Sequence, residues 1–127
     1  MKISPELYSE IITAISLVQT TIRWKPGKDI AHLTTRKKWQ HLPIDATLED
    51  YQTIIRTVIQ DHEALVYLYH YGLHIYPTIV AIVNQQQWLV LFSSKGIMET
   101  AFVIESPEEY LSRPEFELLG KLQEIIQ

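Results

Sequence analysis

The first half of the chain alternates apolar and polar positions with the period of an α-helix. The pattern is clear over residues 4–22 and again over residues 47–60, and each segment begins with a residue that can cap a helix, Ser4 or Thr47. Residues 30–42, between these segments, fit either a short helix or a loop. The pattern therefore predicts two or three amino-terminal helices.

After residue 63 the apolar positions form strand-like runs. Four runs, 64–71, 73–83, 87–92 and 97–104, are separated by short connections that suit antiparallel hairpins. Ser106 and Pro107 then favour a helix start, and an apolar stripe over 116–126 predicts a closing helix that Pro114 restarts. The expected fold is α+β, with amino-terminal helices packed on an antiparallel four-stranded meander and a carboxy-terminal helix.

The composition fits one folded domain over residues 1–127. Apolar residues make up 46% of the chain and charged residues 20%, as is typical of globular proteins. The chain has no cysteine, so disulfides and thiolate chemistry are excluded, and no histidine spacing is typical of a metal site. There is no uncharged apolar run of about 18 residues that would span a membrane. We expect a cytoplasmic protein without a metal or a cofactor.

Basic residues gather in one part of an otherwise acidic chain. The net charge is −4, yet residues 23–38 contain only one acidic residue among six basic ones: Arg23, Lys25, Lys28, Arg36, Lys37 and Lys38. A local cationic patch can hold a phosphate backbone on an acidic domain. A solvated helix and loop surface explains the same cluster without any ligand.

His32 is a candidate catalytic residue because of its neighbours. If residues 30–42 form a helix, His32 and Arg36 lie on one face, four residues apart. An imidazole transfers protons near neutral pH, and a guanidinium neutralises a phosphate. With a nearby hydroxyl, these groups suffice to cleave RNA, because the 2′-hydroxyl is an internal nucleophile beside the phosphorus.

Three segments then carry a resemblance to a known group of proteins: "HLTTRKKW", "LEDYQTIIRTVIQ" and "QWLVLFSSKGIMETAFVIESPEEYL". In this order they resemble the barnase–EndoU–colicin–RelE-like ribonuclease fold, in particular its small phage- and toxin-associated branch, over residues 28–111. The resemblance implies a metal-independent ribonuclease whose site joins an early histidine and arginine to a hydroxyl on the last strand. RNA, and an inhibitor or antitoxin protein, are the partners it implies.

Carried over by position, the resemblance makes His32 the general acid or base and Arg36 the phosphate ligand. Thr100 would bond the phosphate or orient the base. Strand alternation places Thr100 on a face with Met98 and puts Glu99 on the opposite, more open face, so Glu99 is a rival candidate. Further substrate contacts are expected from four basic residues: Lys37, Lys38, His41 and Lys95.

A second hypothesis is a non-catalytic protein-interaction or oligomerisation module on a degenerate nuclease fold. Tyr67, Tyr69 and Tyr71 alternate along one strand and so share one of its faces. That face either covers the core or forms an interface between copies of the chain. The sequence leaves both possibilities open.

Overall fold

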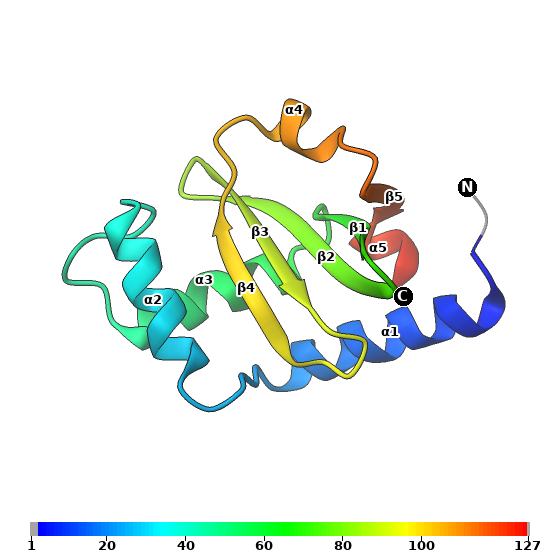
Figure 1. Ribbon diagram of the computed structural model, residues 1–127, viewed down its shortest axis with the longest axis horizontal. Helices are drawn as coiled ribbons and strands as arrows, with labels where there is room; N and C mark the ends of the chain where they lie inside the picture. Colours follow the sequence, from blue (N-terminus) through cyan, green and yellow to red (C-terminus); the bar gives the residue numbers. More distant parts are fainter. Residues whose placement is uncertain (1–2, 127) are drawn as a thin grey trace.

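The computed structural model describes residues 3–126, in which five antiparallel strands form one open sheet in the order β4-β3-β2-β1-β5 (Figure 1). The strands are β1 (Leu65–Tyr71), β2 (His74–Val83), β3 (Gln86–Phe92), β4 (Met98–Val103) and β5 (Phe116–Lys121). The helices are α1 (Pro5–Thr20), α2 (Lys28–Lys38), α3 (Leu48–Gln60), α4 (Pro107–Leu111) and α5 (Leu122–Ile125). The predicted α+β class is confirmed, and β1 to β4 pair consecutively.

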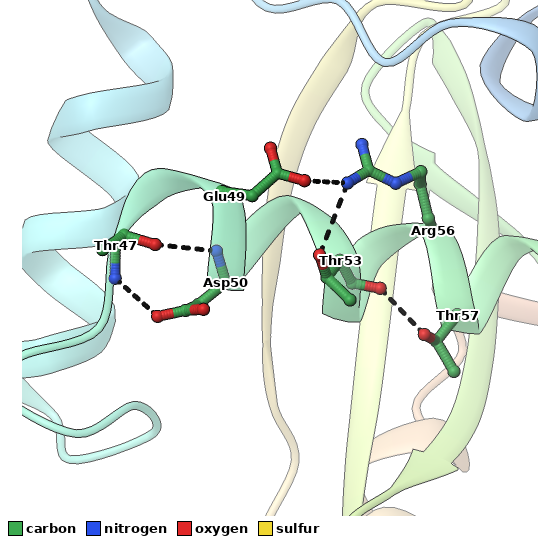
Figure 2. A network of polar contacts seen from close by, with 6 residues as sticks. All are labelled: Thr47, Glu49, Asp50, Thr53, Arg56 and Thr57. Atoms are coloured by element: carbon green, nitrogen blue, oxygen red, sulfur yellow. Dashed lines mark hydrogen bonds and ion pairs between the residues drawn. The ribbon is translucent and has the colours of Figure 1, made fainter.

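The two long amino-terminal helices begin at the caps that the sequence predicts. The Ser4 hydroxyl accepts a hydrogen bond from the Leu7 backbone N–H at 3.1 Å, directly before α1. At the start of α3, Thr47 and Asp50 bond to each other's backbone N–H in a capping box (Figure 2). These three bonds satisfy backbone donors that would otherwise be unpaired at the starts of the helices.

One face of the sheet carries the main core. The apolar stripes of α1 and α3 pack there against β2 and β3, and fully buried side chains such as Ile15, Ile55 and Trp88 fill the space between them. A smaller cluster on the opposite face includes Tyr67, Leu89 and Ile104. The segment between β4 and β5 crosses this second face, where Tyr110 and Leu111 pack against the cluster.

The prediction of a closing helix over 116–126 is wrong for residues 116–121, which form β5. This strand pairs with the free edge of β1, with Phe116 opposite Tyr69 and Leu118 opposite Tyr67. A short apolar run fits both a helix and a strand, and the unpaired β1 edge decides here because it offers backbone hydrogen bonds. The sheet therefore has five strands rather than four, and the final helix is limited to α5.

Strand β4 also departs from the simple alternation that the sequence suggests. Thr100 lies opposite Leu91 and Met98 lies opposite Phe92, so Glu99 is an extra residue in β4. Such a bulge changes the face of the sheet on which the side chains of the preceding residues lie. Met98 and Ala101 consequently belong to the same buried core cluster, and the predicted pairing of Met98 with the face of Thr100 is wrong.

Candidate functional site

Helix α2 lies beside β4, the strand at one edge of the sheet (Figure 1). The segment "IAHLTTRKKWQHL", which fits a helix or a loop by sequence, is helical as far as Lys38. Gly27 starts the helix with a φ of 81°, a conformation that side chains with a Cβ rarely adopt. Just before it, Trp24 forms an isolated bridge to Met98 and ties this connection to the strand.

The fold brings His32 and Thr100 together across 68 residues of sequence. The His32 Nδ1 and the Thr100 Oγ1 lie 3.3 Å apart, within hydrogen-bond distance. Burial lowers the pKa of His32 below its ordinary value, the positive charges of Arg36 and Lys28 lower it further, and the Glu99 carboxylate acts in the opposite direction. His32 is therefore held as a neutral imidazole at neutral pH, the form that accepts a proton.

Arg36 follows His32 by one helical turn and is buried, with only 9% of its surface exposed. Its Nη1 donates to the Nδ1 of His41 at 3.1 Å, and its guanidinium carbon lies 5.5 Å from the centre of the Phe102 ring. Its Nε is buried without a hydrogen-bond partner, and among residues 3–126 no carboxylate forms an ion pair with it. Burial lowers the pKa of this guanidinium as well.

His41 has a fixed protonation state in this arrangement. Its Nδ1 lies 3.1 Å from Arg36 Nη1 and 3.2 Å from the backbone nitrogen of Val103, and both neighbours are donors. The Nδ1 must therefore be an acceptor, so the ring is neutral and its proton is on Nε2. Burial and then the charge of Arg36 lower the pKa of His41, whereas the charge of Glu105 raises it. The lowered pKa favours the same neutral form.

Part of this cluster also covers the free edge of β4. The Tyr51 hydroxyl donates to the Ala101 carbonyl at 2.6 Å, and the Arg23 carbonyl accepts from the Met98 N–H at 2.8 Å. With His41 bound to Val103, these contacts satisfy backbone groups that an edge strand would otherwise expose. His41 and Tyr51 thus have a structural role, whereas no described hydrogen bond joins the side chain of His32 or Arg36 to the backbone of that edge.

The remaining predicted residues lie at different distances from the cluster. Glu99 is half-buried in β4, close enough for its charge to act on His32. Lys37 and Lys38 follow Arg36 at the end of α2, half-buried and exposed respectively. Lys95 is exposed in the turn between β3 and β4, where its N–H bonds to Ser93, and no described interaction joins it to the cluster.

Trp24 also belongs to the site. The sequence gives only a weak signal for it, namely that Trp24 lies between two basic residues, Arg23 and Lys25. Its ring centre lies 5.2 Å from that of His32 and 6.0 Å from that of Tyr51. Its Nε1 is buried and, like the Nε of Arg36, has no hydrogen-bond partner in the described part of the chain. Buried polar groups normally find partners, so two unsatisfied donors in one cluster are unusual.

The structure and the comparisons with known proteins add little to this chemistry. Within residues 3–126, no group of three or more acidic or histidine side chains is placed to hold a metal ion, and no helix of this part of the chain has the length and apolarity needed to cross a membrane. Neither a family model, nor a curated protein, nor a solved structure matches this chain. The site must therefore be interpreted from its own geometry.

Proposed function

We propose that this chain is a metal-independent, ribonuclease-like domain that cleaves RNA in the cytoplasm. The observation that carries the proposal is the environment of Arg36, a buried guanidinium with no carboxylate partner among residues 3–126, flanked by His32 and His41. A buried cation without a counter-ion is unfavourable in a folded protein. An RNA phosphate at the exposed part of Arg36 would supply the missing charge.

In the proposed reaction, His32 is the general base. With its Nδ1 proton donated to Thr100 Oγ1, the Nε2 of His32 is free to take the proton of a ribose 2′-hydroxyl. The 2′-oxygen then forms a bond to phosphorus while the bond from phosphorus to the 5′-oxygen breaks. The departing oxygen takes a proton from water, and His32 returns its proton to the hydroxide that remains. The products are a 2′,3′-cyclic phosphate and a free 5′-hydroxyl.

The other residues of the cluster stabilise this reaction without transferring protons. Arg36 neutralises the charge that develops on the phosphate oxygens. His41 cannot act as a cationic acid while its Nδ1 accepts two hydrogen bonds. In the proposed reaction, its neutral Nε2–H stabilises the phosphate by donating a hydrogen bond instead. Lys37 and Lys38 extend the positive surface along the RNA backbone.

The proposal is tested by incubating the purified protein with a single-stranded RNA in the presence of EDTA. We expect cleavage products that end in 2′,3′-cyclic phosphate. The variant His32→Ala should cleave about 10²- to 10⁴-fold more slowly, which is the usual contribution of a general base. The rate is measured by separating the fragments on a denaturing gel.

The matched control is His74→Ala, which removes an exposed histidine at the start of β2. This variant should cleave RNA at the rate of the unaltered protein. If His32→Ala also cleaves at that rate, the activity comes from a contaminating nuclease. RNA that survives an excess of the unaltered, folded protein would rule out the proposed activity. An inhibitor or antitoxin protein, if the chain has one, is expected to cover the cluster around Arg36.

A further inference from the structure

Two described interactions hold the guanidinium of Arg36. Its Nη1 donates to the Nδ1 of His41, and its guanidinium carbon lies 5.5 Å from the centre of the Phe102 ring. His41 is itself fixed, because its Nδ1 also accepts from the backbone nitrogen of Val103. The Phe102 side chain makes no hydrogen bond, so its rotamer depends on packing alone. The position of Arg36 therefore depends on the side chains that pack against Phe102.

Open space lies beside the Phe102 ring. The ring lines a hollow of about 300 Å³ between the end of β4 and α4, and Trp39 and His41 line other parts of the same hollow. Phe102 is half-buried and belongs to β4, which is an edge strand with a neighbouring strand on one side only. A side chain next to such a space can turn into it, because no close-packed wall limits its rotamers.

Tyr110 of α4 packs against the Phe102 ring. The two rings meet edge to face, with centres 6.0 Å apart and planes at 85°. Aromatic pairs prefer this arrangement, since the positive edge of one ring meets the negative face of the other. Among residues 3–126, no other aromatic ring is paired with Phe102. Tyr110 is therefore the side chain that is best placed to keep the Phe102 ring out of the hollow.

Tyr110 is held by contacts of its own. Its ring centre lies 5.4 Å from that of Phe116 in β5, and the guanidinium carbon of Arg113 lies 4.5 Å from the centre of the Tyr110 ring. The backbone N–H of Tyr110 donates to the Ser106 carbonyl at 2.9 Å. These contacts join the ring to β5 and to the start of α4, so Tyr110 is a fixed support for its neighbour.

We propose that Tyr110 is a positioning residue for Arg36. By keeping the Phe102 ring in place, Tyr110 maintains the ring face near which the guanidinium lies, because a cation is attracted to the negative face of an aromatic ring. The effect on the reaction rests on the proposed ribonuclease function, in which Arg36 stabilises the phosphate. Tyr110 needs no contact with the substrate for this role.

The substitution Tyr110→Leu tests the role in the RNA cleavage assay, because it removes the ring but keeps an apolar side chain. We expect kcat to fall by about three- to tenfold, the loss that follows when a contact between a cation and an aromatic ring is disturbed. KM should change little, because Arg36 acts on the charge that develops during the reaction. Tyr110→Phe keeps the ring and should cleave RNA like the unaltered protein.

The matched control is Tyr76→Leu, which removes a half-buried ring that packs against the same apolar cluster as Tyr110. The aromatic contacts of Tyr76 within residues 3–126 go to Tyr69 and His74, not to Phe102. This variant should be less stable in urea but keep the kcat of the unaltered protein. An equal fall in kcat for Tyr76→Leu and Tyr110→Leu would show that Tyr110 only stabilises the fold, and the positioning role would be wrong.

A second measurement detects Arg36 directly and needs no RNA. The Nε of Arg36 is buried, so its N–H should give an NMR signal that exchanges slowly with solvent, and the loss of this signal in Arg36→Met identifies it. In Tyr110→Leu the N–H should exchange at least about fivefold faster, because a loosened side chain opens more often. Its chemical shift should also change as the Phe102 ring moves. Tyr110→Phe and Tyr76→Leu should leave the signal as it is.

An unchanged Arg36 signal in folded Tyr110→Leu would overturn the proposal. If Tyr110→Leu does not fold, Tyr110→Met, which fills more of the space, takes its place with the same expectations. The positioning role and the proposed function fail in different ways. If the protein leaves RNA intact but Tyr110→Leu alone changes the Arg36 signal, the ribonuclease function is wrong and the positioning role stands. If the protein cleaves RNA and Tyr110→Leu changes neither kcat nor the signal, the positioning role is wrong and the ribonuclease function stands.

Discussion

Arg36 brings a positive charge into a buried position where the only side-chain hydrogen bond it makes within residues 3–126 goes to a neutral histidine. A structural arginine in such a place is normally paired with a carboxylate, because the attraction offsets the loss of hydration. Here the guanidinium gains only its contact with the Phe102 ring and one hydrogen bond. Binding a ligand would explain why an arginine is kept in such a place.

The substitution Arg36→Met separates these two roles. Methionine fills a similar space without a charge, so we expect the free energy of unfolding to stay the same or to rise by about 1 kcal/mol. RNA cleavage should fall by at least about 10²-fold, because the charge on the phosphate is no longer neutralised. Urea denaturation and the cleavage assay give the two values.

The control for this variant is Lys38→Met, which removes an exposed charge two positions later on α2. It should reduce cleavage only slightly. If Arg36→Met instead lowers the free energy of unfolding by several kcal/mol, the arginine is a structural residue and the argument from its missing partner is wrong.

His32 and His41 predict how stability depends on pH. Both have a pKa below the ordinary value of 6.5, mainly because of burial. At pH values between about 6.5, the pKa of a histidine in the unfolded chain, and the lower pKa of the folded state, the unfolded chain binds more protons than the folded chain. The contribution of these residues to stability is therefore complete above about pH 6.5 and is lost as the pH falls below it.

Urea denaturation at a series of pH values between about 8 and 5 tests this linkage. The double variant His32→Gln/His41→Gln should show a smaller loss of stability on acidification than the unaltered protein. Replacing the two exposed residues His62 and His74 by glutamine is the control and should leave the slope unchanged. Equal slopes for all three proteins would contradict the expected linkage.

At the scale of the element, the position of β4 decides the geometry of the site. The bulge at Glu99 sets which residues of the strand face the core, and Thr100 then meets His32. Directly before the bulge, the turn from β3 rests on α1, where Gly96 approaches Leu17 closely. This contact anchors the turn that leads into β4.

Substituting Gly96 by alanine tests the anchor. Gly96 has a φ of +77°, and a Cβ there would lie 2.8 Å from the Cβ of Leu17. Gly96→Ala should lower the free energy of unfolding by about 2–3 kcal/mol, since strain and overpacking add. Gly72 has a similar φ of +60° but nothing within 4 Å, so Gly72→Ala should cost only about 1 kcal/mol. Equal effects in urea denaturation would show that the contact with Leu17 is unimportant.

At the scale of the whole molecule, α1 and α3 cover one face of the sheet, and the other face is only partly covered. Towards β5 that second face exposes two apolar side chains: Tyr71, 64% exposed, and Leu118, 55% exposed. The rings of Tyr69 and Tyr71 stack on this face with their planes 13° apart. Such a surface is the specific support for the alternative function, an oligomerisation module.

If this surface joins two copies, the unaltered chain should scatter light as a dimer at micromolar concentration. Leu118→Glu should then reduce the measured mass to that of a monomer, because an unpaired charge in an apolar interface is unfavourable. Ile44→Glu is the control, since Ile44 is 90% exposed and lies in the loop between α2 and α3. A monomeric unaltered chain would contradict the dimer.

Local patterns predicted most of the elements. The caps at Ser4 and Thr47 and the periodic apolar stripes place α1 and α3, and alternation with short turns places β1 to β4. These signals depend on neighbours within a few residues, so the chain itself contains them. The strand β5 was not predicted, because its apolar run fits a helix equally well until the edge of β1 is available for pairing.

The sequence by itself thus determined the helical segments, the first four strands and a basic stretch with His32 and Arg36 four residues apart. Only the tertiary structure decided that α2 lies along β4, that Thr100 meets His32 and that Trp24 and His41 join them. It also decided that Arg36 is buried with no carboxylate partner among residues 3–126, and that no described interaction joins Lys95 to the cluster. The physical reason is that burial and contact between distant segments depend on how the helices and the sheet pack, which no local spacing records.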